Sequence, residues 1–134
     1  MDPVRTIKLR WVFDAPGDIT YQLARFRFAQ PVPTWQPAIN VYRCGDSIRI
    51  CVDLAGVDRS DIELTVEPKQ VTIRGAREVP EPTEMEDGSV QMMIMEIDYG
   101  PFERTVGLPE EIDTQKATAE QHNGLLWIYL PLKS

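Results

Sequence analysis

The stretch SIRICVDL, residues 47–54, decides the fold. Every second residue from Ile48 to Leu54 is aliphatic, and the residues between them are mostly polar. A period of two is typical of a β-strand with one face against a core. Similar short apolar runs flank this stretch on both sides. The candidate strands lie at residues 39–41, 48–54, 62–66, 71–73, 90–97, 102–108, 117–121 and 125–130.

Turn signals separate these strands and set their register. Cys44-Gly45-Asp46-Ser47 is typical of a hairpin turn, and counting outward from it pairs Cys51 with Asn40. The two cysteines therefore do not face each other, and we expect two reduced thiols packed as small apolar side chains. Asn123-Gly124 lies between two apolar runs, which is the strongest short hairpin signal. Frequent turns with little helix indicate an all-β, antiparallel, immunoglobulin-like β-sandwich of seven to eight strands.

Length and composition favour a single globular domain and exclude several classes of protein. The chain has 134 residues, of which 43% are hydrophobic, enough for one domain with a core. A net charge of −7 disfavours binding to nucleic acid or to an anionic membrane surface. We find no apolar run long enough to span a bilayer and no signal-peptide pattern near the start. We therefore expect a cytoplasmic protein.

The chain divides near a proline-rich segment, residues 31–37. We expect an aromatic-rich N-terminal arm over residues 1–34 and the sandwich domain over residues 35–134. Within the arm, alternation over residues 7–13 favours a strand, whereas residues 19–28 suit a helix or a strand equally. Residues 78–92 form a long acidic, proline-containing loop, and no extended C-terminal tail is expected.

The sequence contains no recognisable catalytic or metal-binding pattern. His122 is the only histidine and lies beside a turn, so it is read as a solvated turn residue. Asp53, Asp58 and Asp61 flank one turn, where carboxylates commonly bond to turn amides. We find neither a zinc spacing nor a phosphate-binding glycine loop. We therefore expect no enzyme activity and no cofactor, and interaction with other proteins remains the function to consider.

From Trp35 to Pro131 the chain resembles the α-crystallin domain of small heat-shock proteins. Six motifs carry the resemblance, in the family's order along the sequence. They are Pro37-Ala38-Ile39-Asn40-Val41-Tyr42, Asp53-Leu54-Ala55-Gly56-Val57, Asp61-Ile62-Glu63-Leu64-Thr65-Val66, Val71-Thr72-Ile73-Arg74-Gly75-Ala76-Arg77, Tyr99-Gly100-Pro101-Phe102-Glu103-Arg104 with Leu108-Pro109, and Ala119-Glu120-Gln121-His122-Asn123-Gly124-Leu125-Leu126. Ala55 stands where the family usually has proline.

The resemblance implies an ATP-independent holdase that assembles from dimers and binds unfolding client proteins. Client binding is expected from the aromatic residues of the arm. Self-association is expected from two further sets of residues, a dimer interface and a groove between strands. Client binding is assigned to Trp11, Phe13, Phe26 and Phe28; the dimer interface to Trp35, Ile39, Val41, Val90, Met92, Met93 and Arg104; and a groove between strands to Leu64, Val66 and Ala119. Family members usually carry a tail motif that docks in a neighbour. Here Leu130-Pro131-Leu132 has its spacing, but Leu130 belongs to the last strand, so large tail-linked assembly is not expected.

Several alternatives stay open. The dimer could form by exchange of the loop strand near residues 90–93 onto the partner's strand at residues 39–41, which we favour. It could also form through one long strand from Val90 to Val106 that pairs with its own copy. For the function, an adaptor sandwich similar to CS domains, which binds one folded partner, is the second hypothesis. A divergent enzyme or ligand-binding sandwich is the third.

Overall fold

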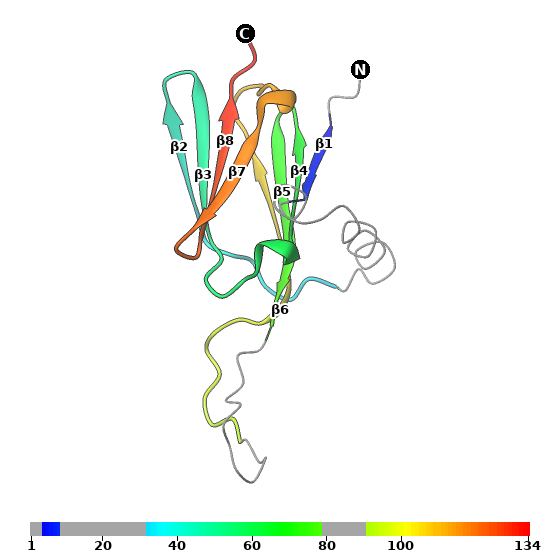
Figure 1. The fold of residues 1–134 in the computed structure, drawn as a ribbon, viewed down its shortest axis with the longest axis vertical. Coiled ribbons are helices and arrows are strands. Elements are labelled where there is room, and N and C mark those ends of the chain that lie inside the picture. The colour runs from blue at the N-terminus through cyan, green and yellow to red at the C-terminus, as the bar shows by residue number, and fades with distance from the viewer. Residues whose placement is uncertain (1–3, 9–31, 79–90) are drawn as a thin grey trace.

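The computed structural model describes residues 4–8, 32–78 and 91–134 (Figure 1). In these residues two antiparallel four-stranded sheets pack face to face. The prediction of an all-β antiparallel sandwich is confirmed. Within the described residues, helix is limited to two short 3₁₀ turns, η1 (Arg59–Asp61) and η2 (Thr114–Lys116). No helix in the described part of the chain is long and apolar enough to cross a membrane.

The first sheet contains the strand that the sequence predicts best. Its order is β2 (Ile39–Cys44), β3 (Ser47–Asp53), β8 (Leu125–Pro131) and β7 (Thr118–His122). The predicted register is confirmed, because Asn40 pairs with Cys51 across the β2–β3 hairpin. The β7–β8 hairpin turns at Asn123 (φ 52°) and Gly124 (φ 80°), and two successive positive φ values are those of a type I′ turn.

The second sheet has the order β1 (Arg5–Lys8), β4 (Ile62–Glu67), β5 (Gln70–Arg77) and β6 (Gly100–Gly107). A row of threonines crosses its outer face, because Thr6 pairs with Thr65, Thr65 with Thr72, and Thr72 with Thr105. On the inner face, Gly75 pairs with Phe102. A Cβ at Gly75 would lie 2.6 Å from Cζ of Phe102, so glycine makes room for this buried ring.

The core lies between the two sheets and follows the period of two. The alternate residues Ile48, Ile50 and Val52 of β3 are buried, and they face buried residues of the other sheet. Burying each such side chain contributes about 1.5–3 kcal/mol. The remaining core members are Leu54, Val57, Ile62, Leu64, Val66, Val71, Ile73, Phe102, Val106, Leu108, Ile112, Ala117, Leu126, Ile128 and Leu130.

Three sequence-based expectations need correction. Residues 5–8, assigned to an arm outside the domain, form strand β1 at the edge of the second sheet. The apolar residues 91–97 were expected to form a strand, but they pair with no strand in the described part of the chain. Both cysteines are unpaired, but only Cys51 is packed; Cys44 is exposed at the end of the edge strand β2.

Candidate interaction surfaces

Strand β2 forms one edge of the first sheet. Ile39 is half-buried and packs against the core, which anchors the start of the strand. Val41 and Tyr42 are 46% and 43% exposed. Among the described strands only β3 pairs with β2, so the other side of β2 presents backbone groups that a further strand could pair with.

Residues 91–97, here called the methionine segment, form the most exposed apolar run in the described part of the chain. Met93 is 89% exposed and Ile94 is 79% exposed. Met92, Met95 and Ile97 are each more than half exposed. A contiguous exposed apolar run marks a site of interaction with another surface. Methionine suits irregular surfaces, because its side chain is unbranched and polarizable.

Arg77 fixes the end of this segment to the sandwich. Its Nε and Nη2 donate to the carbonyl oxygen of Asp98 at 2.8 and 2.6 Å, and its Nη1 donates to that of Ala55 at 3.0 Å. Its Cζ also lies 4.3 Å from the centroid of the Trp35 ring. The guanidinium therefore joins three separate parts of the chain at the foot of the methionine segment.

Trp35 packs against its own sandwich. Its ring centroid lies 5.1 Å from that of Phe102, and its Nε1 donates to the carbonyl oxygen of Gly100 at 3.0 Å. These contacts attach the proline-rich segment before β2 to strand β6. The resemblance implies that Trp35 lies at a dimer interface. This role remains a proposal, and it would use the part of the side chain that is still exposed.

Arg104 also holds the chain that enters β2. Its Nη1 donates to the carbonyl oxygen of Pro37 at 3.1 Å, and Pro37 is buried. On the same strand, Glu103 accepts from Nη2 of Arg74 at 2.6 Å. Arg104 thus positions the start of the β2 edge from within the same chain.

The groove residues expected from the resemblance lie along the opposite edge of the molecule. Leu64 and Val66 are wholly buried on β4, and Ala119 is half-buried on β7. Strand β1 lies along this edge and pairs Ile7 with Leu64 and Arg5 with Val66. Arg5 is a contact residue that the sequence did not predict. Nothing local in the sequence indicates its partners, which lie more than a hundred residues away.

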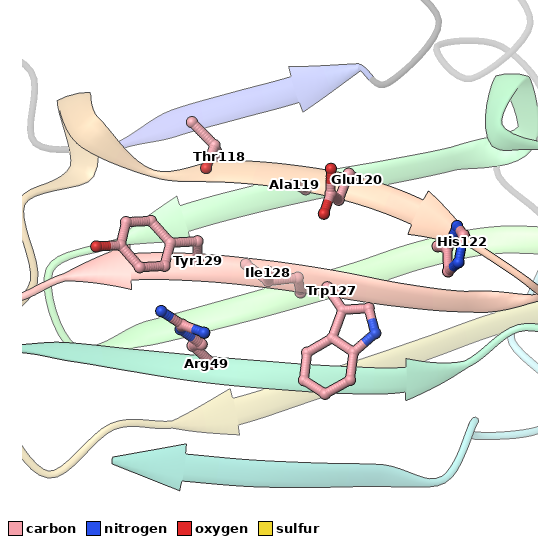
Figure 2. A pocket seen from close by; sticks show the side chains of 8 residues that line it. All are labelled: Arg49, Thr118, Ala119, Glu120, His122, Trp127, Ile128 and Tyr129. Carbon is pink, nitrogen blue, oxygen red and sulfur yellow. The ribbon is translucent and has the colours of Figure 1, made fainter. Parts of the chain in front are cut away.

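The outer face of the first sheet carries an aromatic patch, which we call the aromatic face. The rings of Tyr42 and Trp127 stack with centroids 6.1 Å apart, and Cζ of Arg49 lies 5.2 Å from the centroid of Tyr129. Figure 2 shows the side chains of Arg49, Trp127 and Tyr129, which belong to the neighbouring strands β3 and β8. They border a hollow of about 560 Å³ lined by Arg49, Thr118, Ala119, Glu120, His122, Trp127, Ile128 and Tyr129. The alternation of Trp127 and Tyr129 with buried Leu126, Ile128 and Leu130 could have indicated this face from the sequence.

Trp11, Phe13, Phe26, Phe28 and Val90 lie outside the described residues. Two of the three turn carboxylates bond to turn amides as expected, since Asp58 accepts from the Ser60 amide at 2.9 Å and Asp53 from the Ala55 amide at 3.4 Å. Leu130 belongs to strand β8, as predicted. Within the described residues no group of three or more His, Cys, Asp or Glu side chains could hold a metal ion.

Comparisons with known proteins match this arrangement. Residues 41–134 match the profile of the Hsp20/alpha crystallin family. The spore protein SP21 of Stigmatella aurantiaca is 33% identical over 106 residues, covering 79% of this chain and 60% of that protein. Heat shock protein 16 of Schizosaccharomyces pombe is 32% identical over 95 residues, covering 71% and 65%. The chain thus spans less than two thirds of the length of these relatives.

Solved structures agree with the sequence matches. Heat shock protein 16.0 from Schizosaccharomyces pombe superposes with a TM-score of 0.65 at 29% identity, over 74% of this chain and 88% of that one. The hspA protein from Xanthomonas axonopodis superposes with a TM-score of 0.64 at 31% identity, over 75% and 96%. Sequence and fold therefore point to the same group of proteins.

Proposed function

The chain belongs to the Hsp20/alpha crystallin family of small heat-shock chaperones, and we propose that it is an ATP-independent holdase. In this role it binds client proteins as they unfold and prevents their aggregation. The function requires no bond to be made or broken. It requires an apolar surface that can cover the client's exposed core and a charged body that keeps the complex in solution.

The observation that carries this proposal is the exposure of the methionine segment. Met93 and Ile94 present most of their side chains to solvent, on a segment that has no strand partner among the described residues. Burying apolar surface contributes roughly 25 cal/mol per Å². A few such side chains therefore give a client useful but reversible binding, as a holdase needs. The net charge of −7 supports the solubility of the loaded complex.

The aromatic residues of the N-terminal region would extend this surface. Trp11, Phe13, Phe26 and Phe28 are large apolar side chains clustered in the sequence before the proline-rich segment. Aromatic rings bury more area per residue than other side chains. We therefore assign them to client binding together with the methionine segment.

For assembly we propose that the methionine segment of one copy pairs with the β2 edge of a second copy, and the reverse. Both elements lack a partner on the relevant side among the described residues. Reciprocal pairing of this kind gives a two-fold dimer. Successive side chains of a strand point to opposite faces, so the partner's sandwich would cover only half of the segment. The other half would remain available to a client.

The cellular setting we propose is the cytoplasm. Cys44 is exposed and unpaired, which suits a reducing compartment. The acidic charge disfavours nucleic acid and anionic membranes as partners.

A direct test of client binding uses size-exclusion chromatography of a heat-destabilised client enzyme with and without this protein. We expect co-elution with the unaltered chain and at least a several-fold loss with the double variant Met93→Ser, Ile94→Ser. The matched control is Val32→Ser, which removes an equally exposed apolar side chain, 81% exposed, outside the segment. Equal co-elution of all three proteins would overturn the assignment of the segment to client binding.

The aromatic face favours a second candidate function, an adaptor that binds one folded partner. A hollow bordered by Trp127, Tyr129 and Arg49 has the residue types enriched at centres of specific interfaces. An adaptor would bind one partner at fixed stoichiometry and would not protect unrelated clients. The two functions therefore differ in the number of proteins that are bound.

A further inference from the structure

Three methionines lie within four residues of the methionine segment. They are Met92, Met93 and Met95, which are 54%, 89% and 60% exposed. In Figure 1 this part of the chain extends away from both sheets, below strand β6. Each side chain therefore presents a thioether sulfur to solvent. The proposed binding of clients uses the apolar surface of these side chains and gives the sulfur atoms no role.

Thioether sulfur is a soft metal ligand. Soft thiolate and thioether groups select Cu(I), whereas Ca²⁺ and Mg²⁺ are bound by oxygen atoms. A thioether also carries no proton that a metal ion would have to displace. The three sulfurs are therefore ligands of a different kind from the imidazole and carboxylate groups that form most metal sites in proteins.

The backbone of the segment allows the sulfurs to converge. Residues 91–96 form neither helix nor strand in the structure, and a methionine side chain turns about three bonds. In an extended chain, residues two positions apart lie on the same face, roughly 6.6 Å apart. Met93 and Met95 can therefore close on one ion from the same face. Met92 joins them when the backbone leaves the extended form.

The charges around the segment favour a cation. The segment contains Glu96 and is followed by Asp98, in a protein with a net charge of −7. Because thioethers are neutral, an ion bound by them keeps its positive charge, which nearby carboxylates stabilise. The end of the segment is also held in place, since Arg77 binds the carbonyl oxygen of Asp98.

We propose that Met92, Met93 and Met95 together form a binding site for the soft monovalent cation Cu(I). Cysteine, histidine and carboxylate ligands must lose a proton before they bind a metal ion, so their affinity falls at low pH. The three thioethers have no such competition. The affinity of this site should therefore stay constant across the pH range in which the other ligands become protonated.

The site has a consequence for assembly, which rests on the proposed pairing of the methionine segment with β2 of a second copy. Pairing as a strand puts Met92 on the face opposite to Met93 and Met95. Binding of all three sulfurs to one ion requires a bent backbone instead. A copy that holds the ion therefore cannot donate its segment to a partner, and the cation favours the unpaired form.

The test is a calorimetric titration of the full-length chain with Ag(I), a soft monovalent cation that air does not oxidise, in a chloride-free buffer. All proteins carry Cys44→Ser and Cys51→Ala, so that no thiolate takes up the ion. Cu(I), kept reduced under nitrogen, is the second probe.

Two variants of the segment are compared. The leucine variant, Met92→Leu, Met93→Leu, Met95→Leu, keeps an apolar side chain at each position and removes the sulfurs. Because all three side chains are more than half exposed, these changes leave the core intact. The matched control, Ile94→Leu, Ile97→Leu, alters the same segment and keeps all three sulfurs.

We expect one ion bound per chain, with an affinity for both probes that falls about tenfold or more in the leucine variant and not in the control. The affinity for Ag(I) should be equal at pH 5.5 and pH 7.5. Equal affinity of the leucine variant would overturn the site. An affinity that falls about tenfold between pH 7.5 and pH 5.5 would also overturn it, since the ligands would then be groups that take up protons.

Native mass spectrometry tests the consequence for assembly. Added Ag(I) should shift the protein that retains its methionines toward monomers and leave the leucine variant unchanged. A dimer that stays intact with one ion bound per chain would overturn the exclusion between the ion and strand pairing. A protein that is monomeric before Ag(I) is added would contradict the proposed dimer instead, while the titration still decides the metal site. Neither readout depends on chaperone activity.

Discussion

Arg5 and Gln115 are 110 positions apart in the sequence, yet Nη1 of Arg5 lies 2.9 Å from the carbonyl oxygen of Gln115. The contact makes the start of the chain part of the sandwich. It also joins β1 to the η2 turn, which precedes strand β7 of the other sheet.

The first prediction concerns this contact. In Arg5→Ala we expect faster amide hydrogen exchange over β1 and the facing amides of β4, with β5 unchanged. Hydrogen bonds to charged groups contribute about 1.5–3 kcal/mol, and the partial exposure of Arg5 reduces this. We therefore expect the free energy of unfolding to fall by about 1 kcal/mol. Lys69→Ala, an exposed turn residue, is the control, and identical exchange in both variants would contradict the assigned role.

The second prediction concerns the close approach of Gly75 to β6. In Gly75→Ala the new Cβ would meet the backbone carbonyl oxygen of Asp61 and the buried ring of Phe102. Overpacking of this kind costs about 3 kcal/mol and can prevent folding. Gly107→Ala on β6 is the matched control, since nothing lies within 4 Å of its Cβ position. We expect a large fall in melting temperature for the first variant only; similar melting temperatures for both would refute the packing described.

The fold could be predicted from the sequence where local patterns are strong. The Asn40–Cys51 pairing follows from the turn at residues 44–47, and the last hairpin follows from Asn123-Gly124. The alternate burial of residues in β8 matches its apolar pattern, and the aliphatic residues Ile48, Ile50 and Val52 of β3 are all buried. These features depend on neighbours in the sequence, where turn geometry and the strand period act directly.

The sites were less predictable, because they depend on distant partners. Nothing in residues 5–8 specifies β4 as their partner, since many edges could accept a short strand. The exposure of Cys44 follows from its place at the end of an edge strand, which composition does not reveal. The apolar pattern of the methionine segment predicts a strand, but its lack of a partner among the described residues depends on which edges the sandwich leaves open.

The third prediction concerns the dimer. Deleting residues 80–92 leaves only a short connection between Arg77 and Gly100, which pair at the end of the β5–β6 ladder. The methionine segment could then no longer reach β2 of another copy. We expect monomers in native mass spectrometry and a circular dichroism spectrum like that of the full chain.

The alternative dimer, through one long strand from Val90 to Val106, would behave differently. Its contacts around Ile97 to Arg104 remain after the deletion. A dimer that survives the deletion would therefore contradict the proposed exchange of the methionine segment onto β2.

The fourth prediction concerns the two thiols. Burial raises the pKa of the Cys51 thiol, and the nearby Asp53 carboxylate raises it further. A raised pKa lowers the fraction of reactive thiolate at any pH below it. With an aromatic disulfide reagent at pH 8 we expect Cys44 to react quickly and Cys51 only after unfolding. Cys44→Ser should remove the fast phase, whereas two fast thiols in the native protein would contradict the packing of Cys51.

The central claim is that the protein holds unfolding clients without nucleotide. The most direct measurement is light scattering of two unrelated client enzymes heated with and without this protein, in the absence of ATP. We predict that near-equimolar protein suppresses the scattering of both clients, and that the double variant Met93→Ser, Ile94→Ser suppresses it several-fold less than Val32→Ser. Unchanged scattering of both clients in the presence of the protein, or suppression only after ATP is added, would contradict the account.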